Sequence, residues 1–225
     1  MAVKNGANYI AGQIDSIVCQ LGNSDELIVS DDHSADFTLD IVRRFNDPRI
    51  KMCSSTRFGA THNFEFALSR STGDFIFLAD QDDIWHPNKL ATMMPFFNEF
   101  DMVVCDCTLM DDQRNIISDS FFELNRSGKG FLRNLVRNSY MGCCMGFRRS
   151  VLEKALPFPG DTIVHDFWIG MVAETHFKSL FLKNSLVDHR IHGANASTSG
   201  RTSKVPALKK VTQRYQMVRN LIRSL

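Results

Sequence analysis

The sequence predicts an α/β fold in which a mostly parallel central sheet is flanked by helices. Short apolar runs that are typical of buried strands alternate along the chain with amphipathic segments of about ten residues. Clusters of acidic residues directly follow two of these apolar runs. The 225 residues, 44% of them hydrophobic and with a net charge of +1, have the composition of an ordinary globular domain.

Apolar periodicity defines the elements of the first half of the chain. From Ile10 to Leu21, isoleucine and leucine recur at spacings of four, three and four, which marks one face of an amphipathic helix. Apolar or alternating runs that end on polar turns mark strands. The expected elements are a helix at 7–21, a strand at 26–30, a helix at 35–45, a strand at 49–53, a helix capped by Thr61 and running to 68, a strand at 75–78, a helix that begins at Pro87 and is interrupted at Pro95, and a strand at 101–107.

Residues 2–6 form a loop where a leading strand would be expected. We therefore expect the first strand of the sheet to be truncated, that is, shortened or lost. Such a loss would weaken any site at the carboxyl end of that strand, where open parallel sheets bind their ligands.

Composition limits the compartment and the partners. No apolar stretch approaches the roughly 20 residues of a membrane-spanning helix, and no secretory signal opens the chain, so we expect a cytoplasmic protein. Six cysteines form no CxxC pair and predict buried free thiols. Residues 1–189 carry 18 basic against 25 acidic side chains, whereas 190–225 carry 8 basic and none acidic. An acidic body would repel a phosphate backbone, so no nucleic-acid partner is expected.

Two acidic clusters follow predicted strands. They are Asp31-Asp32 and the run from Asp80 to Asp83. Unpaired carboxylates at one rim of a sheet repel each other unless a cation joins them, and hard divalent ions favour oxygen ligands. The alternative is that each cluster is a solvated turn that caps the following helix. Because Asp80 ends a fully apolar strand and Ile84-Trp85 follow the cluster, we favour the cation site.

Several segments resemble family 2 glycosyltransferases of the GT-A fold, and in particular their bacterial rhamnosyltransferase-like members. The resemblance rests most on Leu78-Ala79-Asp80-Gln81-Asp82-Asp83-Ile84-Trp85, followed by Asn88-Lys89-Leu90. His33 stands where the family commonly has glycine. The other matching segments, in order, are residues 2–6, 13–17, 29–34 (VSDDHS), 141–149 (MGCCMGFRR), 164–168 (VHDFW) and 190–197 (RIHGANAS).

The resemblance implies a GT-A glycosyltransferase domain at 1–200, followed by a basic amphipathic helix at 201–225. The nucleotide-sugar half would span about 1–107 and the acceptor half about 108–200, as in other two-part nucleotide-binding α/β folds. The implied donor-binding residues are Ala2, Val3, Lys4, Asn5, Asp31, Asp32, Asp80, Gln81 and Arg190. The implied ligands of a Mg²⁺ or Mn²⁺ ion are Asp80, Asp82 and His192, and the implied acceptor-side residues are Gly142, Cys143, His165 and Trp168.

By the same resemblance, Asp166 is the candidate general base. Displacement at an anomeric carbon requires the attacking hydroxyl to lose its proton, and a single base implies inversion. The alternative is that Asp166 only caps the helix that begins at Phe167. His192 could equally be structural, and a core position for at least one of Trp85 and Trp168 is favoured over stacking on a sugar.

The C-terminal segment predicts a basic amphipathic helix. Its apolar stripe is Leu208, Val211, Tyr215, Val218, Ile222 and Leu225. Residues 205–225 could lie on an anionic membrane, pack on the acidic body or pair with a second copy in a homodimer; packing or pairing is favoured.

The resulting hypothesis is a metal-dependent, inverting transfer of a sugar from a UDP- or dTDP-sugar to a hydroxyl acceptor. That acceptor would be a glycan or lipid-linked glycan in bacterial surface polysaccharide synthesis. The alternative is a catalytically silent nucleotide- or glycan-binding subunit, which the truncated first strand motivates. A nucleotidyltransferase is disfavoured because the chain lacks an N-terminal glycine-rich phosphate loop.

Overall fold

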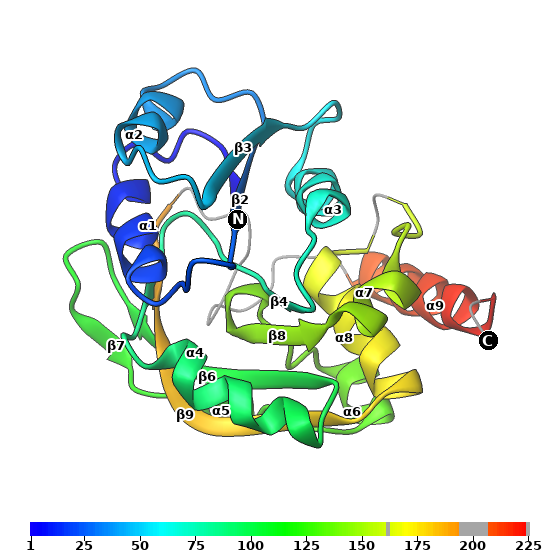
Figure 1. Ribbon diagram of the computed structural model, residues 1–225. Coiled ribbons are helices and arrows are strands. Elements are labelled where there is room, and N and C mark those ends of the chain that lie inside the picture. Colours follow the sequence, from blue (N-terminus) through cyan, green and yellow to red (C-terminus); the bar gives the residue numbers. More distant parts are fainter. Residues whose placement is uncertain (161–162, 194–206, 224–225) are drawn as a thin grey trace.

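The computed structural model describes residues 1–160, 163–193 and 207–223 (Figure 1). The chain forms a mixed α/β fold with two sheets, and helices cover their faces. Residues 194–197 of the expected closing loop, together with 201–206 of the expected C-terminal helix, lie outside the described residues.

The first sheet is wholly parallel, with strand order β1-β2-β3. The segment expected as a loop at residues 2–6 begins with a two-residue strand, so the first strand is short but present. Strand β2 is buried along its whole length, as its continuous apolar run predicted. The strands are β1 (Ala2–Val3), β2 (Leu27–Asp31) and β3 (Ile50–Ser54), and the helices between and after them are α1 (Ile10–Val18), α2 (Thr38–Arg44) and α3 (Ala60–Arg70).

The second sheet has strand order β4-β8-β6-β9-β5, with β7 paired to β6. Only β6 and β9 pair in parallel; all other pairs are antiparallel, so the expectation of a mostly parallel sheet is wrong here. Strand β8 causes much of the difference, because it runs between β4 and β6 in the opposite direction. The strands are β4 (Phe75–Phe77), β5 (Ile84–Trp85), β6 (Met102–Met110), β7 (Ile116–Ser118), β8 (Met145–Arg148) and β9 (Ser179–Arg190).

The helices of the second half surround this sheet (Figure 1). As expected, Pro95 interrupts the helix that follows Pro87: α4 gives way there to a 3-10 turn, η1. Thr61 is not the cap of α3, because the helix already begins at Ala60. The helices are α4 (Lys89–Met93), η1 (Met94–Asn98), α5 (Phe121–Asn125), α6 (Phe131–Val136), η2 (Gly142–Cys144), α7 (Arg149–Ala155), α8 (His165–His176) and α9 (Ala207–Arg223).

Helix α9 packs on α8, but not through the stripe that its sequence predicted. Met217 and Leu221 are buried, and the guanidinium of Arg214 lies 4.4 Å from the ring centroid of Phe167. Val211, Tyr215 and Ile222 of the predicted stripe are exposed instead. The helix thus docks on its neighbour through a mixed face and leaves its more regular apolar face outward.

Two further expectations concern buried thiols and membrane spans. Four of the six cysteines are fully buried and none forms a disulfide, but Cys53 is half-buried and Cys19 is exposed. The expectation of buried thiols is therefore wrong for Cys19, which lies at the end of α1. Among the described residues, no helix combines the length and apolar character needed to cross a bilayer.

Candidate functional site

The candidate site is built where β1, β2 and β4 end. Ala2 forms a parallel bridge with Asp80, which joins the first sheet to the segment that follows β4. The Lys4 amide donates to Gln81 Oε1 (2.8 Å), and Gln81 Nε2 donates to the Lys4 carbonyl (2.9 Å). These two hydrogen bonds of the Gln81 side chain join the end of β1 to the acidic run. Val3 is buried in the core, whereas Lys4 and Asn5 are exposed at this rim.

Asp31 and Asp32 are both buried, so they do not form an ordinary solvated turn. Asp32 Oδ2 accepts from the Gly59 amide (3.0 Å) and from Lys4 Nζ (3.1 Å). Burial raises the pKa of Asp32, but these hydrogen bonds outweigh it and hold the pKa below its ordinary value. His33 has a φ of +58°, a left-handed backbone that suits the glycine common at this position in the family it resembles.

The ionised form of the Asp80 carboxylate is unfavourable in this environment. Burial, and then the negative charges of Asp83 and Asp82, raise its pKa to about 8. Its carboxylate accepts no hydrogen bond from the described residues, although its backbone carbonyl accepts one from Gln13. A group in this environment is costly to ionise unless a positive charge joins it.

Asp82 meets the loop that follows β9. His192 Nε2 lies 2.8 Å from Asp82 Oδ2, and both side chains are about nine-tenths buried. The ring of Tyr9, at the start of α1, stacks on the His192 ring with centroids 4.9 Å apart. Arg190 also contacts these residues: its Nε donates to the Asp82 carbonyl (3.1 Å), and its guanidinium is 5.1 Å from the Tyr9 ring centroid.

The three expected metal ligands are therefore only partly assembled. Asp82 and His192 are in direct contact. Within the described residues, however, the single group of three ligand atoms that lie within 4.8 Å of one another is Asp83, Cys143 and His189. Asp80, Asp82 and His192 do not form so close a group in the described part of the chain, although the charge of Asp82 helps to raise the pKa of Asp80.

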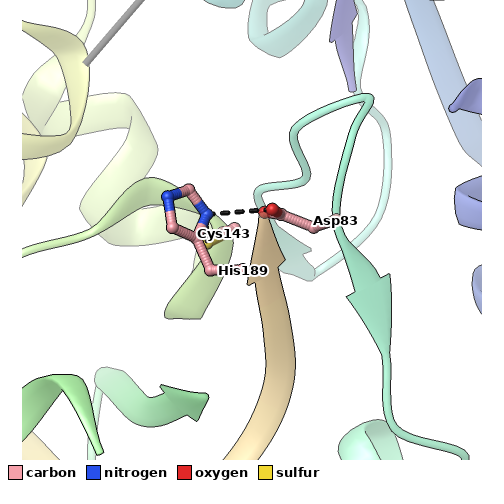
Figure 2. A group of neighbouring side chains, drawn as sticks. All are labelled: Asp83, Cys143 and His189. Atoms are coloured by element: carbon pink, nitrogen blue, oxygen red, sulfur yellow. Dashed lines mark hydrogen bonds and ion pairs between the residues drawn. The ribbon is translucent and has the colours of Figure 1, made fainter. Parts of the chain in front are cut away.

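The Asp83, Cys143 and His189 group is wholly buried, and Figure 2 shows the Asp83 and His189 side chains facing each other. Asp83 Oδ1 accepts from His189 Nδ1 (2.9 Å) and from the Arg190 amide (3.1 Å). Burial opposes the charge of both groups, but their mutual attraction raises the pKa of His189 and lowers that of Asp83. The contact between His189 and Asp83 fixes the end of β9 against the acidic run, and the three side chains would hold a metal ion only with His189 neutral.

Breaking this ion pair is expected to destabilise the fold. Asp83→Asn removes the charge that holds His189, and losing one partner of a buried pair typically costs about 3–5 kcal/mol. We expect a loss of that order in the free energy of unfolding, measured by urea denaturation. Asp119→Asn, the same substitution at an exposed carboxylate, is the control and should change it little. Equal stability of the two variants would contradict the assignment.

Asp166 begins α8, and its side chain is part of the same acidic environment. Burial raises its pKa to about 6, although hydrogen bonds from the Phe167 and Gly142 backbone amides oppose the shift. Its charge is also among the groups that raise the pKa of Asp80. Asp166 therefore lies in the first turn of α8 and its charge acts on the acidic run, but it does not cap the helix: the cap position is Val164, and no side chain makes a cap hydrogen bond there.

The four acceptor-side candidates are all buried, and two of them, Gly142 and His165, pack beside Asp166. A Cβ on Gly142 would lie 3.2 Å from His165 Nε2, so the two residues are in close contact. His165 is buried and stacks on Phe64, with centroids 3.8 Å apart, and burial lowers its pKa to about 3. These two residues pack the wall that supports Asp166.

Cys143 and Trp168 correct the sequence expectation. The Cys143 thiol is fully buried, 3.8 Å from His189 Nδ1. The Trp168 indole is also buried and donates from Nε1 to the Ala155 carbonyl (2.8 Å). Neither side chain reaches the surface, so the expected acceptor contacts of these two side chains are wrong. Trp85 is likewise a core residue.

Sequence reasoning missed three residues that shape this site: Tyr9, Asp83 and His189. Asp83 stood within the acidic run, but nothing local distinguished it from Asp82. His189 alternates with the apolar residues of β9, which is a usable signal for a buried polar group. Tyr9 carried no signal, because its partners, His192 and Arg190, lie far away in the sequence.

Comparisons with known proteins agree with this architecture. Residues 1–156 match the model of the family described as Glycosyl transferase family 2. WfgD of Escherichia coli, a UDP-Glc:alpha-D-GlcNAc-diphosphoundecaprenol beta-1,3-glucosyltransferase, is 39% identical over 183 residues, which cover 78% of this chain and 69% of WfgD.

Two solved structures share the fold. TarS of S. aureus with UDP-GlcNAc has a TM-score of 0.74 at 18% identity, over 99% of this chain and 64% of that one. The mannosyltransferase PcManGT of Pyrobaculum calidifontis, with GDP-Man and Mn²⁺, has a TM-score of 0.67 at 20% identity, over 99% and 62%. The chain thus spans less than two thirds of either solved protein.

Proposed function

The chain belongs to glycosyltransferase family 2, and we propose that it transfers a sugar, with inversion, from a UDP- or dTDP-sugar to a hydroxyl acceptor. The observation that carries the proposal is the meeting of Asp80, Asp82 and Asp166 at one acidic site beside the ends of β1 and β2. A nucleoside diphosphate and a divalent cation would complement that site in charge.

The donor would lie along the first sheet. Asp31 and Asp32 are placed at the carboxyl end of β2, where a carboxylate can accept from a base N–H or a ribose hydroxyl. Ala2 to Asn5 would form the opposite wall at the end of β1, and Asp80 would face the ribose or the diphosphate. Arg190 is held by backbone carbonyls near Asp82 and could approach a phosphate oxygen.

A divalent ion would be held by Asp82 and His192. Oxygen and imidazole donors suit Mn²⁺, and Mg²⁺ would use the oxygens alone. When bound, such an ion would neutralise the diphosphate and make the nucleotide a better leaving group. The Mn²⁺ in the structure of PcManGT supports the proposal of a divalent ion at this site. Asp166 would take the proton of the acceptor hydroxyl, and the wall formed by Gly142 and His165 would fix its position.

The acceptor proposed is a glycan or a lipid-linked glycan of a bacterial cell surface. WfgD, whose acceptor is a diphosphoundecaprenol-linked GlcNAc, supports this class. The proposed location is the cytoplasm, at the inner face of the membrane. The proposed domain organisation is a nucleotide-sugar half, an acceptor half and a C-terminal helix. The exposed stripe of α9 could contact that membrane or a second copy.

Calorimetric titration of UDP and dTDP, with and without Mn²⁺, tests the donor site. We expect one nucleotide to bind more tightly in Mn²⁺ than in EDTA, because the acidic site repels a diphosphate unless a cation neutralises it. Incubation of the UDP- or dTDP-sugar with a lipid-diphosphate GlcNAc acceptor then tests transfer. Metal-dependent binding without any transfer over a panel of sugars and acceptors would favour the silent-subunit alternative; no binding by a folded protein would refute both.

A further inference from the structure

The short helix α6 shows a partly inverted amphipathic pattern: Phe131 and Leu135 pack against the core, but its other apolar side chains do not. Its polar Asn134 is fully buried, whereas Leu132 and Val136 are 75% and 82% exposed. Because Leu132 and Val136 are four residues apart on one helix, their side chains lie on the same face. A soluble helix normally buries its apolar side chains and exposes its polar ones. The inversion leaves apolar surface in water that the fold does not use.

The buried asparagine explains how this arrangement is held. Asn134 Nδ2 donates to the carbonyls of Gly128 (2.9 Å) and Gly130 (3.0 Å), and its Oδ1 accepts from the Ser139 amide (3.0 Å). The Gly130 amide donates to Glu174 of α8 (2.9 Å). The exposed face of α6 is therefore preformed on the helix that also carries Asp166.

The charge around this face is mostly positive, and the exposed Glu123 of α5 is its nearest acidic neighbour along the chain. Residues 124–137, which we call the α5–α6 surface, contain four basic side chains and no acidic one. All four basic side chains are exposed: Arg126, Lys129, Arg133 and Arg137. A third apolar side chain, Leu124, is 49% exposed at the end of α5. Hydrogen bonds from Arg133 to the Arg126 carbonyl and from Arg137 to Asn125 tie the two helices together.

We propose that the α5–α6 surface is a docking site for an anionic phospholipid membrane. Exposed apolar side chains ringed by arginine and lysine match a bilayer that offers hydrocarbon beneath negative headgroups. The concentration of positive charge on an otherwise acidic body favours this occupant over a second copy, because two copies of the same basic surface would repel each other. The surface is separate from the exposed stripe of α9, so it adds a contact that the C-terminal helix does not provide.

Co-sedimentation with vesicles tests the proposal on the full chain. We expect binding to phosphatidylglycerol-containing vesicles that weakens as salt is added, and little binding to vesicles of phosphatidylcholine alone. Leu132→Glu combined with Val136→Glu should abolish the binding. Arg133→Glu should weaken it at least about fivefold, since each basic residue near such a surface contributes about that factor.

Two control variants make the outcome specific. Ile116→Glu with Ile117→Glu changes a comparably exposed apolar pair on β7 and should leave binding intact. Tyr215→Glu with Ile222→Glu tests whether the exposed stripe of α9 contributes to vesicle binding. Binding that survives the α6 changes but not the α9 changes, or that ignores lipid charge, would overturn the proposal, as would a dimer that the α6 changes dissociate. Nucleotide binding by each variant is measured separately, so failure of the donor site is distinguishable.

Discussion

Replacing Asp166 with asparagine is expected to lower the rate of sugar transfer by about 10²–10⁴-fold, the usual contribution of a positioned general base. An amide cannot accept the proton of the attacking hydroxyl. The side chain is nearly the same size, and the donor residues lie on other elements, so UDP binding should be unchanged. The expected result is thus a loss in kcat without a change in nucleotide affinity.

The pH dependence of the wild-type rate gives a second readout. Burial raises the pKa of Asp166 to about 6, and the base acts in its deprotonated form. The rate should therefore rise with pH up to about 6 and level off above it. Asp119→Asn should keep both the rate and this profile, because its carboxylate is exposed. A variant at Asp166 that retains wild-type turnover would leave this residue only a structural role in the first turn of α8.

Replacing Asp82 with asparagine is expected to remove the metal dependence of nucleotide binding. Changing a residue that only supports a metal ligand costs 10–100-fold in affinity, so the loss of a ligand should cost at least about 100-fold. His192→Gln removes the other proposed ligand and should act in the same direction. The measurement is Mn²⁺ titration by electron paramagnetic resonance, followed by calorimetry with UDP.

The stability of the Asp82→Asn protein distinguishes a metal-binding role of Asp82 from a structural one. Burial and then the charge of Asp83 raise the pKa of Asp82, which means that its negative charge is unfavourable in the metal-free fold. The metal-free Asp82→Asn protein should therefore be about as stable as the wild type, or more stable. Mn²⁺ should raise the melting temperature of the wild type but not of the variant. A metal-free variant destabilised as much as Asp83→Asn would show that Asp82 mainly holds the fold.

The two neighbouring aspartates illustrate what local sequence can and cannot distinguish. The apolar run before Asp80 and the acidic run after it predicted a strand that ends in a carboxylate cluster, and the structure confirms both. The different roles of Asp82 and Asp83 depend on partners 110 and 106 residues away, His192 and His189. No spacing rule within the acidic run contains that information.

The same division applies to the fold. Periodicity located the C-terminal helix and, except for β5, the helices and strands expected between residues 7 and 107, because the pattern of apolar residues is a property of each segment by itself. It failed for the pairing of β8 with β4 and β6, and for the face of α9 that packs on α8. Both depend on which distant surface each segment meets.

By itself, the sequence determined the α/β elements, the two acidic clusters at strand ends and the resemblance to a glycosyltransferase family. Only the tertiary structure decided that, among the described residues, Asp80 does not form a close ligand group with Asp82 and His192, that Asp83 and His189 form a buried ion pair, and that Cys143 and Trp168 are core residues. The physical reason is that secondary structure follows from neighbours along the chain. Burial, pKa shifts and ligand geometry follow from neighbours in space, which the packing of distant segments brings together.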